Sequence, residues 1–297
     1  MIKTNYFRPK LVLFLKGILF CLFIYLFVSR AEKIHFSEIQ FENFWAFSGC
    51  FLLTPVNWFF EWLKWKLIVE KIDEENNPSN LTAFASGVIS SFLTPSLSGN
   101  FLGRMLYYDK SKRWKIIVFS TIANFSQFLV AVVFGFLALS LLGNSSLFQV
   151  NIFFVLILFI LLTFLYFFGE LIFAQIPINQ IQLVSNLINK GPSRLLFLGI
   201  SLLRYIIFII QYVFALSAFG IELDYKVMLV IPIVFLFITL SPSLFFGKII
   251  VRESIAITVF GLMGYATSPV IFASFTTWFF NLFLTAMISL LIVKKSS

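Results

Sequence analysis

Long apolar runs separated by short charged loops are the feature that most constrains this chain. Six runs reach the roughly 20 residues that a helix needs to cross a bilayer. They cover 11–29, 45–68, 115–141, 149–169, 195–219 and 269–293. Charged residues make up only 12% of the 297 residues, about half of the share in a soluble domain. We therefore expect an all-α, polytopic membrane protein that forms a single integral membrane domain over 1–297.

Two further apolar segments, 79–108 and 228–264, are interrupted by a similar pattern. Residues 94–99 read Thr-Pro-Ser-Leu-Ser-Gly, and residues 241–247 read Ser-Pro-Ser-Leu-Phe-Phe-Gly. Proline and glycine oppose a continuous helix, and hydrocarbon tolerates a broken helix only where the freed backbone groups face protein or a watery cavity. Each segment is predicted to form a broken or re-entrant helical hairpin, although 228–264 is also long enough to cross twice.

Loop charges predict the orientation. If both broken segments return to the side they left, fourteen Lys and Arg residues lie on the cytoplasmic side: Lys3, Arg8, Lys10, Lys64, Lys66, Lys71, Lys110, Lys112, Arg113, Lys115, Lys190, Arg194, Lys294 and Lys295. The outer side then holds three: Arg30, Lys33 and Lys226. This bias favours cytoplasmic N- and C-termini. The halves 45–141 and 195–293, joined by a polar linker at 170–194, become inverted repeats, which is a recurrent plan of transporters.

Composition and residue types exclude several other functions. The net charge of +9 sits in short loops between apolar runs, so it serves membrane topology rather than nucleic-acid binding. Cys21 and Cys50 lie inside apolar runs, and the single histidine, His35, lies in a loop. No metal-ligand cluster and no nucleophile–base pair is visible in the sequence. We predict no metal, no cofactor and no enzymatic activity.

The candidate binding residues follow the two breaks. Arg104 and Arg252 each lie five residues after a glycine, Gly99 and Gly247 respectively. A helix that starts at the break directs free N–H groups toward its beginning, and a guanidinium nearby adds positive charge. Both features favour an anion, phosphate in particular. The alternative for Arg104 is that its side chain extends from near the cytoplasmic Lys cluster to the membrane surface.

Four further residues complete the predicted substrate-binding set: Asn100, Lys248, Glu61 and Gln127. Glu61 and Lys64 are three residues apart, and tryptophans flank them. Lys64 is interpreted as an interfacial residue in an aromatic belt, whereas Glu61 is left as a partner for one of the arginines. For Gln127, as for Asn124 and Asn281, a hydrogen bond between helices is the more common role. For Arg204 with Gln211, such a hydrogen bond and a substrate contact explain the residues equally well.

The chain resembles a known family at these motifs. The resemblance rests on Asn57-Trp58 with 61–67, on 92–104 with Ser126-Gln127, and on 240–254. These stretches are similar to the flippase-like membrane domain, a polytopic module found at the N-terminal side of lysylphosphatidylglycerol synthases and as free-standing bacterial proteins. The chain departs from the family pattern at Asn100, where a Glu is common, and at Phe245-Phe246 and Lys248.

The resemblance implies binding and transbilayer movement of a modified or anionic phospholipid. This agrees with the two basic, broken-helix half-sites read from the residues. We therefore expect a lipid translocase or lipid-binding protein of the inner membrane, with a membrane phospholipid as its partner. The alternatives are a membrane-embedded transferase acting on lipid-linked sugars, and a non-transporting assembly partner of a lipid-modifying enzyme.

Overall fold

The computed structural model describes most of the chain. The described residues are 41–72, 77–94, 98–142, 151–174, 192–241 and 247–296, together with Cys21, Tyr25 and Val28. Apart from those three positions, the predicted first span at 11–29 lies outside the described residues. So do His35 and most of the predicted linker at 170–194.

Every element that the described residues form is a helix, so the predicted all-α fold is confirmed for this part of the chain. The helices are α2 (Phe44–Lys71), α3 (Asn80–Leu93), α4 (Ser98–Met105), α5 (Lys110–Leu141), α6 (Ile152–Ala174), α8 (Arg194–Ala218), α9 (Tyr225–Leu240), α10 (Gly247–Leu262), α11 (Thr267–Trp278), the π-helix η2 (Phe279–Leu284) and α12 (Thr285–Ser296).

Three of the described helices are long and apolar enough to cross a membrane, judged by length and composition. They are Lys110–Leu141, Arg194–Ala218 and Thr267–Val293. Two shorter helical stretches, Phe153–Gly169 and Tyr225–Leu240, are also apolar. The 28-residue helix α2 is not in this group. It carries Glu61 and Lys64 among its apolar residues, and both residues belong to the candidate site described below.

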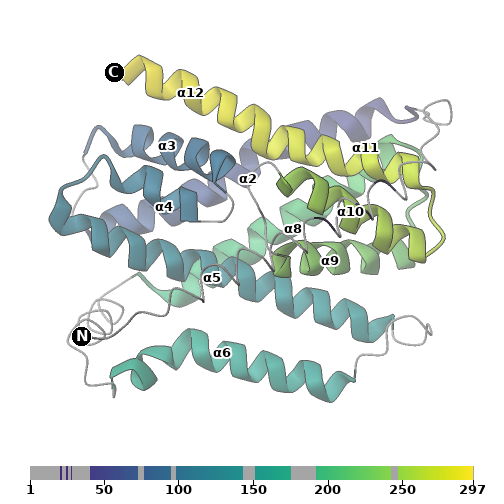
Figure 1. Cartoon of the computed structure of the whole chain (residues 1–297), viewed down its shortest axis with the longest axis horizontal. Coiled ribbons are helices and arrows are strands. Elements are labelled where there is room, and N and C mark those ends of the chain that lie inside the picture. Colours follow the sequence, from purple (N-terminus) through teal and green to yellow (C-terminus); the bar gives the residue numbers. More distant parts are fainter. Residues whose placement is uncertain are drawn as a thin grey trace.

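The helices run roughly along the long axis of the molecule, and their ends gather at two opposite faces (Figure 1). One face holds the end of α2, the start of α3, the end of α4, the starts of α5 and α8, and the end of α12. The starts of α2, α6, α9 and α11 and the ends of α5, α8 and α10 lie at the other face. The pair α3–α4 therefore approaches from one face and the pair α9–α10 from the opposite face.

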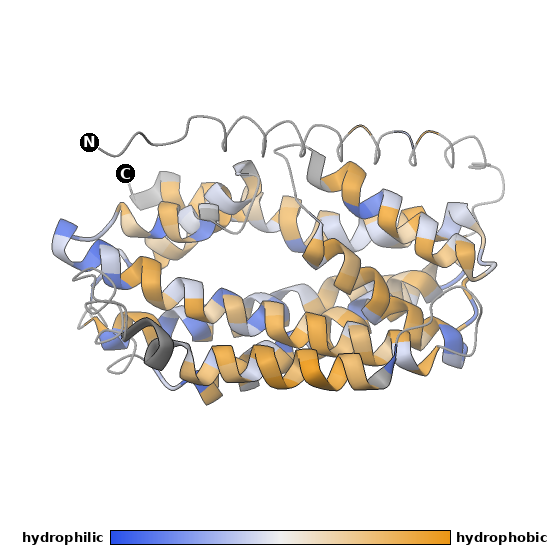
Figure 2. Ribbon diagram, turned by 60° about the horizontal axis from the view of Figure 1, so that its bottom comes forward, coloured by the Kyte–Doolittle hydropathy of each residue, from blue (hydrophilic) through white to orange (hydrophobic). Residues whose placement is uncertain are grey.

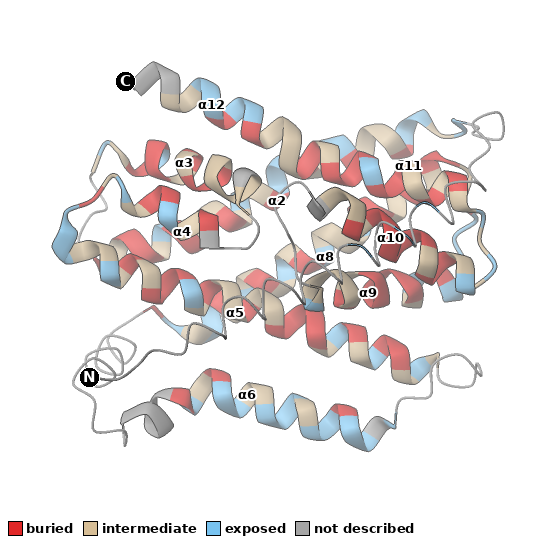
Figure 3. Ribbon diagram, in the orientation of Figure 1, coloured by how far each residue is buried: buried red, intermediate tan, exposed pale blue. Residues whose placement is uncertain are grey.

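The apolar core lies among α8, α9, α10 and α11, where side chains such as Val230, Ile233 and Ala256 are fully buried. Figure 2 shows the apolar residues along the middle of the helices and the polar residues mostly toward the helix ends. Helix α6 packs against α5 at the edge of the molecule. It exposes a row of large apolar side chains (Figure 3), among them Phe153, Ile157 and Ile160. Such a surface suits hydrocarbon rather than water.

Both predicted breaks occur. In the first segment, α3 ends at Leu93 and α4 begins at Ser98. Helix α3 closes with Thr94, whose backbone N–H and side-chain hydroxyl both donate to the carbonyl of Ser90. In the second segment, α9 ends at Leu240 and α10 begins at Gly247. The two helices of each segment pack against each other. Residues 95–97 and 242–246, which include both prolines, lie outside the described residues.

The α3–α4 hairpin depends on glycines in its contact face. Gly99 and Gly103 lie one turn apart on α4, and Gly87 lies on α3. A Cβ added at Gly103 would overlap the carbonyl of Ser86 and the hydroxyl of Ser90, both on α3. At Gly99 the overlap would be with Thr94 and the backbone of Ser90. Small residues at this spacing let two helix backbones approach closely inside a membrane.

We expect Gly103→Ala to lower the free energy of unfolding by about 1–3 kcal/mol, because the new methyl group has no space between α3 and α4. Thermal unfolding of the purified protein in detergent measures the effect. Gly199→Ala is the matched control, since a Cβ at Gly199 in α8 meets no atom within 4 Å. Equal melting temperatures for the two variants would show that close α3–α4 packing does not stabilise the fold.

Two glycines and the side chain of Asp224 define the helix ends at the face of the molecule where α9 and α11 begin. Helix α8 is followed by Gly220 (φ 78°) and α10 by Gly264 (φ 88°), which terminate the helices in the left-handed conformation. Asp224 caps α9 by accepting the N–H of Val227 at 2.8 Å, and the hydroxyl of Tyr265 donates to the same carboxylate oxygen at 2.7 Å. The hydrogen bonds from Val227 and Tyr265 lower the pKa of Asp224. Desolvation first, and then the neighbouring Asp224, raise the pKa of Tyr265. This contact joins the start of α9 to the loop before α11.

Candidate headgroup site around Glu61

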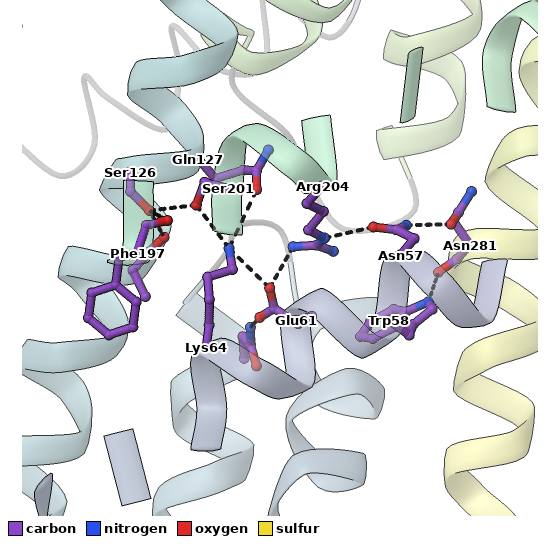
Figure 4. A network of polar contacts seen from close by, with 12 residues as sticks. Asn57, Trp58, Glu61, Lys64, Ser126, Gln127, Phe197, Ser201, Arg204 and Asn281 are labelled. Carbon is purple, nitrogen blue, oxygen red and sulfur yellow. Dashed lines mark hydrogen bonds and ion pairs between the residues drawn. The ribbon is translucent and has the colours of Figure 1, made fainter. Parts of the chain in front are cut away.

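Polar side chains form a continuous network through the middle of the helices (Figure 4). Helix α2 contributes Asn57, Glu61 and Lys64, which are four and three residues apart and therefore share one face of the helix. All three side chains are buried. Their partners come from α4, α5, α8 and the π-helix η2, so the network joins both halves of the chain.

The carboxylate of Glu61 is the centre of this network. Its Oε2 accepts from Nη1 of Arg204 at 2.6 Å and lies 3.3 Å from Nζ of Lys64. Its Oε1 accepts from Nη2 of Arg104 at 3.1 Å and from Nδ2 of Asn100 at 3.1 Å. Both oxygens thus have two donors each, which keeps Glu61 in its charged form. We call Glu61, Lys64, Arg104 and Arg204 the Glu61 cluster.

The Glu61 cluster carries more positive than negative charge. Three cationic side chains contact one carboxylate, so three positive charges minus one negative charge leave an excess of two. Lys64 and Arg104 are each 2% exposed, and Arg204 is 15% exposed. Burying unbalanced charge is costly. Among the described residues, no second carboxylate forms an ion pair with these cations.

Aromatic faces cover the two guanidinium groups. Cζ of Arg104 lies 4.8 Å from the ring centroid of Trp65 and 5.1 Å from that of Phe84. Cζ of Arg204 lies 5.8 Å from the ring of Trp58 and 5.4 Å from that of Phe208. Cation–π contacts of this kind stabilise a cation that has lost its water. They also hold the planar groups in fixed orientations, which bidentate binding of a phosphate requires.

One arm of the network extends from Lys64 into α5 and α8. Nζ of Lys64 lies 3.4 Å from both Oε1 of Gln127 and Oγ of Ser201. The hydroxyls of Ser201 and Ser126 are 2.7 Å apart, and Ser126 donates to the carbonyl of Ala123 at 2.7 Å. The ammonium group of Lys64 is therefore held by neutral oxygens on two neighbouring helices as well as by Glu61.

The other arm passes from Arg204 to the C-terminal helices. Nε of Arg204 donates to Oδ1 of Asn57 at 2.8 Å, and Nδ2 of Asn57 donates to Oδ1 of Asn281 at 2.6 Å. Asn281 in turn donates to Oε1 of Gln211 at 3.1 Å, and its backbone carbonyl accepts from Nε1 of Trp58 at 3.0 Å. Asn281 lies in η2. A π-turn changes which side chains face a neighbour and is frequent at functional sites.

The structure brings together four of the predicted binding residues. Asn100 and Arg104 both donate to Glu61, and Gln127 joins them through Lys64. Gly99 is also close by in the chain, but it packs against α3. The prediction that Glu61 is an arginine partner is confirmed.

Three interpretations from the sequence are wrong. Lys64 is a buried member of the network and neither an interfacial residue nor a loop charge. Trp65, assigned to an aromatic belt, is also fully buried, with Nε1 donating to the carbonyl of Asn80 at 3.2 Å. The alternative that Arg104 extends to the membrane surface fails as well, because Arg104 turns inward to Glu61. Lys66, counted with Lys64 among the cytoplasmic charges, is exposed and lies 3.9 Å from Glu70.

The second predicted half-site lies apart from the Glu61 cluster. Nη2 of Arg252 donates to Oγ1 of Thr277 at 2.6 Å, and no hydrogen bond or ion pair between described residues joins Arg252 to Glu61. Gly247 begins α10, as predicted for a helix that starts at the break. The side chain of Lys248 lies outside the described part of the structure.

Comparison of the chain with protein-family models, with curated proteins and with solved structures finds no match. The fold and the network themselves define the class: an all-helical protein with helices fit to cross a membrane, containing a buried cluster with excess positive charge. A function for this class has to be argued from the chemistry of the cluster.

Proposed function

We propose that this chain is a multi-pass protein of the bacterial inner membrane that binds the anionic headgroup of a phospholipid at the Glu61 cluster and moves it between the leaflets. The observation that carries the proposal is the buried excess of two positive charges, three cations against one carboxylate. A phosphate supplies the negative charge and the oxygen acceptors that this arrangement lacks.

The depth of the cluster supports a role in crossing the bilayer. Glu61 lies ten residues before the end of α2, and Arg204 lies ten residues after the start of α8. At a rise of about 1.5 Å per residue, both lie about 15 Å from those helix ends. This distance is half of a hydrocarbon layer roughly 30 Å thick. Charged side chains at this depth usually line a pathway for substrate or ions.

Asn100 adds to the positive character of the site. In the flippase-like family that the chain resembles, a Glu is common at this position. Here the neutral Asn100 donates to Oε1 of Glu61. A glutamate at 100 would place a second carboxylate beside Glu61 and reduce the excess charge from two to one. The departure from the family pattern therefore favours an anionic ligand over a zwitterionic one.

The packing of the helices supports the predicted inverted repeat of 45–141 and 195–293. Helix α2 packs against α8, which are the first helices of the two halves. The last long helix of the first half, α5, packs against α9 of the second hairpin, and α12 of the second half packs against α3 of the first hairpin. Each half thus packs its last long helix against the hairpin of the other half, as expected for two halves related by a twofold axis. In transporters, halves related in this way rock against each other.

The proposed orientation gives a labelling prediction. Lys110 and Lys226 are exposed and lie at the starts of α5 and α9, at opposite faces of the molecule. In a background without Cys21 and Cys50, a membrane-impermeant maleimide should label Lys226→Cys in intact cells and Lys110→Cys only after permeabilisation. Labelling of both positions from the same side would contradict the re-entrant hairpins and the inverted repeat.

The alternative of a transferase acting on lipid-linked sugars requires a carboxylate that is free to act as a base. Within the Glu61 cluster, each oxygen of the carboxylate already has two donor groups beside it, so this cluster favours binding over chemistry. The remaining alternative, an assembly partner of a lipid-modifying enzyme, predicts a protein that binds lipid and does not move it.

Transport separates these functions. The purified chain is reconstituted into vesicles with a trace of fluorescent phosphatidylglycerol or phosphatidylcholine, and a membrane-impermeant quencher reports which lipid reaches the outer leaflet. We expect the protein to accelerate the exchange of phosphatidylglycerol more than that of phosphatidylcholine. Rates equal to those of protein-free vesicles for both lipids would contradict lipid movement.

A further inference from the structure

A second buried carboxylate, Glu253, lies outside the Glu61 cluster and has a different environment. Glu253 is on α10 and 3% exposed. One of its oxygens, Oε1, accepts from the hydroxyl of Ser274 on α11 at 3.0 Å. The other, Oε2, is buried and has no hydrogen-bond partner among the described residues. A charged carboxylate in such a place is poorly stabilised, because a buried polar atom without a partner loses its water and gains nothing in return.

The adjacent cation, Arg252, lies within electrostatic reach of this carboxylate but forms no hydrogen bond with it in the described structure. Arg252 directs Nη2 to Thr277 on α11 at 2.6 Å, and its Nε has no hydrogen-bond partner in the described structure. Two neighbouring residues of opposite charge thus each leave a buried polar atom unpaired. Unpaired buried polar atoms are rare in folded proteins, and a functional role is one of their established explanations.

Few other charged groups surround Glu253. Tyr212 on α8 lies within electrostatic reach of both Glu253 and Arg252, and Cys50 on α2 lies within reach of Arg252. Helix α11 contributes the neutral hydroxyls of Ser274 and Thr277. Helix α9 carries its titratable side chains, Tyr225 and Lys226, in its first turn. Arg252 is therefore the one cation of α10 and its packing partners α8, α9 and α11 that is described close to Glu253.

A cavity adjoins the side chain of Glu253. It has a volume of about 220 Å³ and is lined by Ile249, Ile250, Glu253, Ile271, Phe272 and Phe275, on α10 and α11. Glu253 is the one ionisable residue in this lining. The accessible surface of this lining is apolar, so the carboxyl oxygens of Glu253 do not open into the cavity in the present arrangement. The space is large enough for a change in the rotamer of Glu253, which would bring the carboxyl group into the cavity.

We propose that Glu253 is a proton-binding site that couples the movement of α10 against α11 to a proton gradient. In the present arrangement of α10 and α11 the carboxylate takes up one proton and becomes a neutral carboxylic acid. When α10 shifts so that Arg252 or water reaches Oε2, the proton leaves and the carboxylate is restored. Glu61 does not share this behaviour, since four donors hold it charged. The coupling to lipid movement rests on the proposed function, whereas proton binding by Glu253 does not.

Infrared spectroscopy tests proton binding directly. At neutral pH the wild-type protein should show the absorption of a protonated carboxyl group, shifted by deuterium oxide, and Glu253→Gln should lose it. Glu222→Gln is the control, because Glu222 is an exposed carboxylate in the loop between α8 and α9. Circular dichroism and size-exclusion profiles equal to those of the wild type establish that Glu253→Gln is folded. A Glu253→Gln spectrum identical to that of the wild type would overturn the proposal.

Transport under an imposed proton gradient tests the coupling. In the vesicle assay, a gradient should accelerate phosphatidylglycerol exchange by the wild type several-fold and leave Glu253→Gln unaffected. A wild type that moves lipid equally with and without the gradient would overturn the coupling. If the wild type shows the carboxyl absorption but moves no lipid under any gradient, the proposed function fails and the proton-binding site stands.

Discussion

Glu61→Gln should destabilise the protein strongly, lowering the free energy of unfolding by about 3–5 kcal/mol. Removing one partner of a buried ion pair leaves the other charge uncompensated, and here three cations lose their common carboxylate. The amide group of a glutamine would in addition direct N–H donors toward the N–H donors of Arg104, Arg204 or Lys64. Thermal unfolding in detergent and the monodisperse fraction after purification measure the loss.

Two variants test the cause of this effect. Glu70→Gln removes a carboxylate from the same helix, but its partner Lys66 is 60% exposed, so the change should stay within about 1 kcal/mol. Adding Lys64→Met to Glu61→Gln removes one of the three stranded cations and should recover part of the lost stability. The effect of Lys64→Met on the free energy of unfolding is measured in the wild type and in Glu61→Gln. If Lys64→Met lowers it by the same amount in both backgrounds, the charges of Glu61 and Lys64 are not coupled.

Arg104→Gln should weaken the binding of phosphatidylglycerol by roughly ten- to a hundredfold while the protein remains folded. A charge-assisted hydrogen bond contributes about 1.5–3 kcal/mol, and each 1.4 kcal/mol corresponds to about a factor of ten in affinity. Glu61 would keep Arg204, Lys64 and Asn100 as partners, so this variant removes excess positive charge without leaving an unpaired anion. The dependence of the melting temperature on added lipid measures the affinity.

Lys66→Gln is the matched control for charge. It also removes one positive charge from the sequence, but at an exposed position on α2. Its affinity for phosphatidylglycerol should equal that of the wild type. If Lys66→Gln and Arg104→Gln weaken binding equally, the lipid responds to the overall charge of the protein and not to the Glu61 cluster.

Much of the fold could be predicted because it depends on local sequence. Apolar length located the helices, and the Pro- and Gly-containing motifs located the ends of α3 and α9. The return of each hairpin to its own side of the membrane was predicted from loop charges and stays a prediction. Figure 1 shows the start of α3 with the end of α4 at one face of the molecule, and the start of α9 with the end of α10 at the other. The π-helix at 279–284 had no such signal. Apolar composition alone does not distinguish it from a regular helix.

The site was predicted only in part, because its partners are distant in the chain. Glu61 was identified as an arginine partner, but the sequence did not show that Arg204, 143 residues away, is the closest of its three cations. Lys64 was misassigned because a lysine among tryptophans is typical of a membrane interface. The signal that places it correctly is its spacing from Asn57 and Glu61, which puts all three on one buried face of α2.

The lipid that the Glu61 cluster retains tests its proposed role most directly. Native mass spectrometry of the purified protein, titrated with phosphatidylglycerol and phosphatidylcholine of identical acyl chains, compares the two headgroups alone. We predict that the wild type retains phosphatidylglycerol preferentially, and that Arg104→Gln abolishes the preference. Equal retention of the two lipids by the wild type would contradict the claim that this buried positive charge binds an anionic headgroup.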